Sequence, residues 1–135
     1  MKKQEVQLLK RRLIYLCLSI LCFAACALIV IFLNDNRFIR GFVGDIIVIS
    51  LIYFLIKTFH NFNSLKLVTF TLALAYITEF SQYLRLANFL GLEHNTIARI
   101  VIGSVFDPFD LIAYTIGAFL VYFIDTKLIR RCISI

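Results

Sequence analysis

Three polar side chains interrupt a stretch of sequence that is otherwise apolar enough to lie in a membrane. Glu79, Gln82 and Arg85 follow one another at intervals of three residues, which on a helix places a carboxylate, an amide and a guanidinium along one stripe. A carboxylate in hydrocarbon is costly unless a partner or water meets it, so we expect Glu79 to face the interior of a helical bundle. These groups could hold a charged or hydroxyl-bearing ligand if other segments bring partners to them.

The composition indicates the class of protein that positions these groups. Of 135 residues, 61% are hydrophobic and only one is proline, which predicts an all-α, polytopic membrane protein with a single transmembrane domain over residues 1–135. The net charge of +6 could suggest nucleic acid, but the basic residues gather at the ends of apolar runs, as topology signals do. We therefore expect membrane lipids as partners and no nucleic acid.

The apolar runs predict four transmembrane helices, at residues 13–33, 44–59, 66–86 and 107–124. Residues 96–105 are too few to cross a bilayer, so a short interfacial or re-entrant helix is expected between the third and fourth spans. Asp107 followed by Pro108 predicts the N-cap and first residue of the fourth span. Asp125 is expected to lie beyond that span, outside the bilayer.

Four spans put both termini on one side of the membrane. Lysine and arginine are more numerous on that side, in the N-terminal tail, the turn after the second span and the C-terminal tail. The positive-inside rule therefore predicts that both termini are cytoplasmic, in the cytoplasmic (inner) membrane of a bacterium. Lys57, in the last turn of the second span, is expected to complement the helix dipole.

With this topology, polar residues from three segments converge near the outer leaflet. The residues predicted to bind a ligand there are Arg40, Asp45, Glu79, Gln82, Arg85, Arg99, Asp110 and Tyr114. The Tyr114 hydroxyl could hold Glu79 or Gln82, and Gly117 would allow close helix approach. Simpler roles stay open, because the aspartates could only cap helices and the arginines could only anchor to lipid phosphates.

Cysteines and histidines give no sign of a catalytic or metal centre. Cys17, Cys22 and Cys26 lie within the first span, where cysteine behaves as a small apolar residue, and no spacing suits zinc. His60 and His94 fall in turns, and the sequence has no Ser/His/Asp order or glycine-rich phosphate loop. We assign no catalytic residue and expect no metal or cofactor.

One set of spaced residues resembles the pattern of VanZ-like membrane proteins. These residues are Glu79-x-x-Gln82, Arg99 and Asp110-x-x-x-Tyr114-x-x-Gly117. The chain is more similar still to an uncharacterised bacterial integral-membrane family, domain of unknown function 2809, in which residues like Arg40, Gly44 and Asp45 open the second span. VanZ-like proteins commonly have asparagine in place of Tyr114. The resemblance covers about residues 40–118 and implies a multi-span protein, linked in some VanZ-like members to glycopeptide-antibiotic resistance.

Three functions are compatible with these residues, and the first is our leading hypothesis. It is the binding of an anionic envelope component, such as a lipid-linked phosphate headgroup, through Arg37, Arg40, Arg85 and Arg99. The second is a metal-dependent enzyme acting on lipid-linked phosphates, with oxygen ligands from Asp45, Glu79, Asp107 and Asp110. The third is a structural subunit of a membrane complex.

Overall fold

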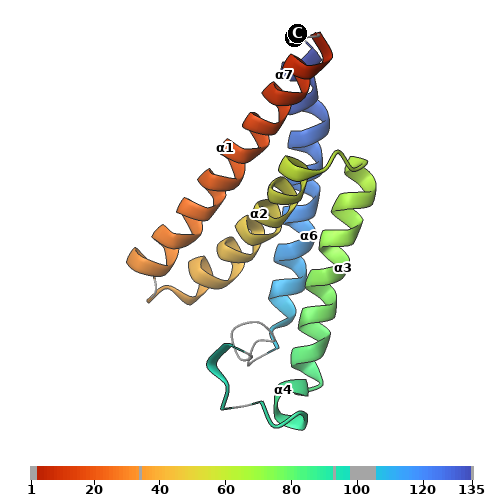
Figure 1. The fold of residues 1–135 in the computed structure, drawn as a ribbon. Coiled ribbons are helices and arrows are strands. Elements are labelled where there is room, and N and C mark those ends of the chain that lie inside the picture. The colour runs from red at the N-terminus through yellow and green to blue at the C-terminus, as the bar shows by residue number, and fades with distance from the viewer. Residues whose placement is uncertain (1–2, 34, 93, 98–105, 135) are drawn as a thin grey trace.

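Four long helical segments make up the protein in the computed structural model (Figure 1). The structure describes residues 3–33, 35–92, 94–97 and 106–134. In chain order the elements are α1 (Lys3–Phe32), the π-helix η1 (Ile39–Val43), α2 (Gly44–Phe59), α3 (Ser64–Tyr83), α4 (Leu86–Phe89), α6 (Pro108–Phe123), the π-helix η2 (Ile124–Ile129) and α7 (Arg130–Ser134). The described residues include no strand, which confirms the all-α class.

Three helical stretches are long and apolar enough to cross a membrane. They are Lys3–Phe32, Ile39–Phe59 and Pro108–Cys132. These stretches support an integral membrane protein. α3 has 20 residues but is not among them, because polar side chains lower its hydropathy. Of the short helix predicted over residues 96–105, only residues 96 and 97 are described, so the rest of that prediction lies outside the described residues.

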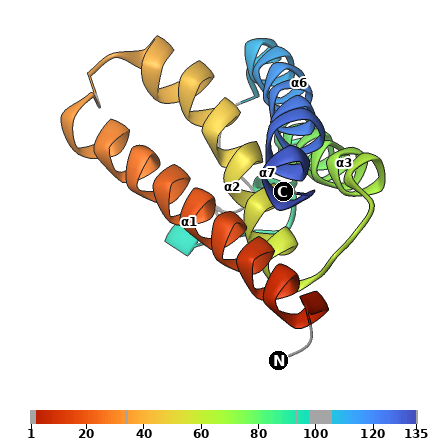
Figure 2. The same cartoon turned by 90° about the horizontal axis from the view of Figure 1, so that it is seen from above.

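Both termini lie at one end of the helical bundle, beside the connection between α2 and α3 (Figures 1 and 2). This end is termed the terminal end. α6 contacts both α2 and α3, and α1 packs against α2. The opposite end, termed the far end, holds η1, α4 and the start of α6 (Figure 1). Side chains from segments distant in the sequence therefore meet at each end.

Local sequence signals explain where α3 and α6 begin. Asp107 accepts a hydrogen bond from the Phe109 amide at 3.0 Å, and Pro108 is the first helical residue, as predicted. Asn63 caps α3 in the same way, by accepting a hydrogen bond from the Leu65 amide at 2.9 Å. Each cap satisfies an amide that the first helical turn leaves without a carbonyl partner.

α3 ends earlier than the sequence pattern predicts. The helix stops at Tyr83, and Arg85 adopts a left-handed conformation with φ of 50°. Such a residue commonly terminates a helix, and the short α4 starts directly after it. Arg85 therefore does not continue the helical stripe that begins with Glu79 and Gln82.

The close contact of α2 with α6 depends on a glycine. Ile49 and Val121 are buried in the hydrophobic core at this contact. A Cβ atom added at Gly117 would lie 3.1 Å from both the Cα and the carbonyl oxygen of Ile46. Since those atoms belong to the backbone, they cannot move aside as a side chain can. The predicted role of Gly117 in close helix approach is therefore confirmed.

Replacing this glycine tests the packing. We expect Gly117→Ala to lower the free energy of unfolding by about 1–3 kcal/mol, because the added methyl group forces α2 and α6 apart. Gly44→Ala is the matched control, since a Cβ there meets nothing within 4 Å and alanine is a better helix former. Thermal unfolding in detergent, followed by circular dichroism, measures both. A midpoint for Gly117→Ala at or above that of Gly44→Ala would contradict the packing argument.

Candidate functional site

Four polar side chains meet beneath the far end of the bundle, from α2, α3 and α6. They are Asp45, Glu79, Asp110 and Tyr114, termed here the acidic cluster. Glu79 is only 1% exposed, as its predicted inward orientation requires. The Tyr114 hydroxyl donates a hydrogen bond to its Oε1 at 3.3 Å. The carboxyl groups of Asp45 and Asp110 lie within hydrogen-bonding reach of each other. The structure thus brings together four of the residues predicted for the site.

A pocket of about 250 Å³ opens beside this cluster, termed the far-end pocket. Its lining comprises Arg37, Phe38, Gly41, Phe42, Asp107, Phe109 and Asp110. Arg37 comes from the connection after α1, whereas the two aspartates come from the start of α6. The pocket is therefore amphipathic, because a guanidinium, two carboxylates and three aromatic rings line it.

The other residues predicted for the site are not brought together with the acidic cluster in the same way. Gln82 is half-buried on α3, while Arg40 and Arg85 are exposed on η1 and after α3. Neither of these arginines lines the far-end pocket. Arg99 lies outside the described residues. Among the described arginines, Arg37 is thus the one whose place in the fold fits a ligand contact at this end.

A second polar site lies at the terminal end and is built around Asp125. This carboxylate is 0% exposed. It accepts hydrogen bonds from the hydroxyl groups of Tyr15, Tyr53 and Ser64. The Lys57 ammonium lies 3.2 Å from its Oδ2. Donors from α1, α2 and α3 therefore converge on one acid at the end of the last long helix, and together they offset the desolvation of a buried charge.

Ser64 links this acid to a second cation. Its hydroxyl donates to Asp125 and accepts from Lys57 at 3.0 Å and from Arg130 at 2.9 Å. A hydroxyl group has one proton to donate and two lone pairs to accept with, so these three contacts use the whole hydrogen-bonding capacity of Ser64. The π-helical geometry of η2 helps, because i to i+5 spacing aligns Arg130 with Asp125 on one side of the helix.

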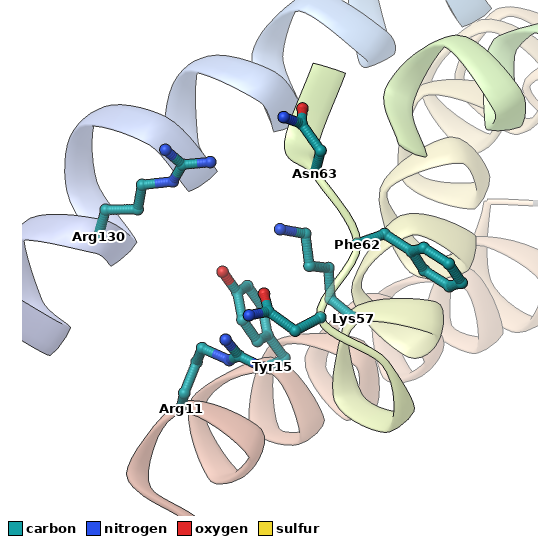
Figure 3. Close-up of a pocket in the computed structure, with 7 residues that line it drawn as sticks. Arg11, Tyr15, Lys57, Phe62, Asn63 and Arg130 are labelled. Atoms are coloured by element: carbon teal, nitrogen blue, oxygen red, sulfur yellow. The ribbon is translucent and has the colours of Figure 1, made fainter. Parts of the chain in front are cut away.

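A larger pocket opens next to this network, termed the terminal-end pocket, with a volume of about 510 Å³. It is lined by Arg11, Tyr15, Lys57, Asn61, Phe62, Asn63 and Arg130 (Figure 3). Figure 3 shows the charged ends of Arg11, Lys57 and Arg130 directed toward one shared space. This pocket is polar and basic, in contrast with the mixed charge of the far-end pocket.

The terminal-end site is not predicted by the sequence patterns. Asp125 was expected outside the bilayer, and Lys57 was expected to complement a helix dipole, but both are buried and paired with each other. The signal available was the presence of Tyr15 and Tyr53 within apolar runs, because buried tyrosine hydroxyls need partners. No spacing rule connects those tyrosines with an acid more than 70 residues further along the chain.

The described residues limit the chemistry that these sites can perform. No group of three or more His, Cys, Asp or Glu side chains among them is arranged to hold a metal ion. Both Asp125 oxygens accept hydrogen bonds within the protein, and the Ser64 hydroxyl uses its proton and both lone pairs. The network at the terminal end therefore acts as a framework that positions the side chains around it.

The Asp125 network makes a testable contribution to stability. We expect Asp125→Ala to lower the free energy of unfolding by about 3–5 kcal/mol, because it leaves the buried Lys57 ammonium without its counter-charge. Tyr15→Phe removes one of several donors and should cost about 1 kcal/mol. Asp35→Ala, at an exposed acid, is the control and should leave stability within about 0.5 kcal/mol. Equal losses for Asp125→Ala and Asp35→Ala, measured by unfolding in detergent, would refute the network.

Comparison with known proteins bears on the middle of the chain. The family described as "Protein of unknown function (DUF2809)" matches residues 34–118, which is more than half of the 135 residues. That range contains the acidic cluster and Gly117, whereas Tyr15 and Asp125 lie outside it. No curated protein and no solved structure matches the chain. The chain belongs to the DUF2809 family of proteins of unknown function.

Proposed function

We propose that this protein is a multi-pass protein of the bacterial cytoplasmic membrane that binds an anionic, lipid-linked headgroup of the cell envelope in the far-end pocket. The observation that carries the proposal is the mixed lining of that pocket, to which Arg37, Asp107 and Asp110 contribute charged groups and three phenylalanines contribute aromatic rings. A headgroup joined to a lipid chain is itself amphipathic, so it can contact both the charged and the aromatic lining residues.

Each part of the wall has a chemical role in this proposal. The Arg37 guanidinium presents paired N–H donors that match two phosphate oxygens. The Asp107 and Asp110 carboxylates would accept hydrogen bonds from headgroup hydroxyl groups. Phe38 and Phe42, whose rings stack with centroids 5.2 Å apart, offer apolar surface to the adjoining lipid chain. A ligand that carries phosphate, hydroxyl groups and hydrocarbon would use all of these contacts.

The acidic cluster supports this pocket from beneath. Asp110 belongs to both, because it lines the pocket and lies within hydrogen-bonding reach of Asp45. Glu79 and Tyr114 join α3 to α6 next to it. These contacts hold the start of α6 in place, which fixes the position of the carboxylates relative to Arg37. The predicted site residues therefore include positioning groups as well as groups that would touch the ligand.

The proposal includes a fourth crossing by α3, with both termini in the cytoplasm. At 1.5 Å per residue, 20 residues give a helix of about 30 Å, which matches the hydrocarbon core. The polar groups that lower the hydropathy of α3 have partners on α6: Glu79 with Tyr114, and Tyr76 with Thr115 at 2.7 Å between hydroxyls. The far end would then lie in the outer leaflet, where a VanZ-like envelope role would place it.

The two other functions have less support. A metal-dependent enzyme requires a set of acidic ligands around one point, and the described residues offer no such arrangement. A structural subunit would be compatible with the many large apolar side chains exposed on the helices, but contact with lipid explains that exposure equally well. Headgroup binding is favoured because it uses the mixed charged and aromatic lining of the far-end pocket.

The fourth crossing can be tested by the accessibility of single cysteines. With the native cysteines replaced by serine, we expect His60→Cys and Asn88→Cys to be labelled from opposite sides of the membrane, because α3 separates them. Both positions are exposed in the structure. A membrane-impermeant maleimide added to intact cells, and then to permeabilised cells, makes the distinction. Labelling of both positions from one side would show that α3 does not cross.

Ligand binding can be tested with a photoreactive polyprenyl phosphate added to the purified protein. We expect crosslinked peptides that contain residues 37–42 or 107–110, because these line the far-end pocket. Arg37→Ala should reduce their labelling about tenfold, as expected for a lost charge-assisted hydrogen bond. Arg12→Ala removes an exposed arginine at the terminal end and should leave labelling unchanged. Undiminished labelling in Arg37→Ala, or adducts confined to other helices, would disprove the proposed site.

A further inference from the structure

The positively charged side chains that line the terminal-end pocket outnumber the acidic side chains that pair with them. Three cations line it, Arg11, Lys57 and Arg130, and none of the described lining residues is acidic. The nearby Asp125 is paired with Lys57 at 3.2 Å, and its oxygens are already occupied by hydroxyl donors. Three positive charges and one negative charge leave two positive charges, which belong to the arginines. Two guanidinium groups facing one space repel each other unless an anion lies between them.

The arginines also have unused hydrogen-bonding capacity. The Nε of Arg11 is buried without a hydrogen-bond partner among the described residues. Arg130 donates through one nitrogen to the Ser64 hydroxyl, a neutral acceptor. A guanidinium has five N–H donors, so both groups can donate further into the pocket. The charged ends of both guanidinium groups point toward the pocket (Figure 3), so their terminal nitrogens are the donors that a ligand oxygen would meet.

Asparagine side chains also line the terminal-end pocket. The side-chain oxygen of Asn63 accepts from the Leu65 amide at 2.9 Å, so the NH₂ group is the part of that side chain left to donate. Asn61 lines the pocket on the same connection between α2 and α3. The volume of about 510 Å³ lies in the range of small-ligand sites. The pocket thus presents donors from α1, α7 and the connection between α2 and α3.

We propose that the terminal-end pocket binds a phosphate group, with Arg11 and Arg130 as its two guanidinium contacts. Phosphate is favoured because its tetrahedral oxygens accept paired N–H donors from more than one arginine at once. The two positive charges left by the pairing of Lys57 with Asp125 match a phosphate dianion. The bound group would join the start of α1 to α7. It would be a second site, distinct from the far-end pocket and independent of the function proposed for it.

Two sources could supply this phosphate. The pocket contains residues from near the start of Lys3–Phe32 and near the end of Pro108–Cys132, two stretches long and apolar enough to cross a membrane. Lipid phosphates gather near the ends of such helices. A phospholipid headgroup could therefore enter from the side, and free phosphate could enter from water. The shared chemistry is the phosphate group, and an experiment with both kinds of probe separates the sources.

The test measures the thermal midpoint of the purified full chain with two probes. Inorganic phosphate is compared with chloride at equal ionic strength, and phosphatidic acid is compared with phosphatidylcholine in mixed micelles. We expect at least one phosphate probe to raise the midpoint, since a ligand that binds the folded state stabilises it. A response to phosphatidic acid alone assigns a lipid source, and a response to inorganic phosphate alone assigns a soluble one. No rise with either probe would overturn the proposal.

Adjacent arginines provide matched controls. Arg11→Gln and Arg130→Gln should each weaken the apparent affinity for the active probe about tenfold or more. Arg12→Gln and Arg131→Gln change exposed residues that do not line the pocket, and they should respond as the unmodified protein does. If Arg11→Gln does not fold, Arg11→Lys keeps the charge without the paired donors and should still bind more weakly. Equal responses from pocket variants and controls would refute the site.

Discussion

A buried carboxylate constrains how this chain can fold. Asp125 has no exposed surface, and a charge removed from water is tolerated only when several donors surround it. Those donors come from α1, α2 and α3, through Tyr15, Tyr53, Ser64 and Lys57. No one of these helices can satisfy the acid alone. The terminal end therefore forms only when the N-terminal helix, the connection after α2 and the last long helix are all in place.

The burial of Asp125 also explains why a basic pocket lies beside it, although the pair formed by Asp125 and Lys57 is neutral. Asp125 holds Lys57 by charge and holds Ser64 by a hydrogen bond, and Ser64 in turn positions Arg130. The acid thus fixes the direction of two cations while neutralising only one charge. Arg11 approaches the same space from α1 without an acid of its own among the pocket residues. Because Asp125 takes Lys57 as its counter-charge, Arg11 and Arg130 are left available to bind an external anion.

Some of this architecture could be predicted from sequence, because the signals were local. Asp107 and Pro108 begin α6 as expected, and the polarity of Glu79 within an apolar run correctly implied burial against a partner. The terminal-end network could not be predicted in the same way. Asp125 stands at the end of an apolar run, where an acid normally meets water, and its burial depends on tyrosines and a lysine supplied by other helices. The end of α3 was predicted too late in the chain, because left-handed geometry at Arg85 leaves no distinct mark in the sequence.

One face of the last long helix connects the two ends of the molecule. Asp110, Tyr114, Gly117, Val121 and Asp125 follow at spacings of three or four residues, so they lie along the same side of α6 and its continuation. The outer two are acids that belong to the two polar sites, one to each, and Gly117 between them packs directly on the backbone of α2. Close contact at that point leaves little room for α6 to slide or rotate against α2. The helix can therefore hold two separate polar sites in fixed positions, since the packing at its centre, and not the ligands, sets its place in the bundle.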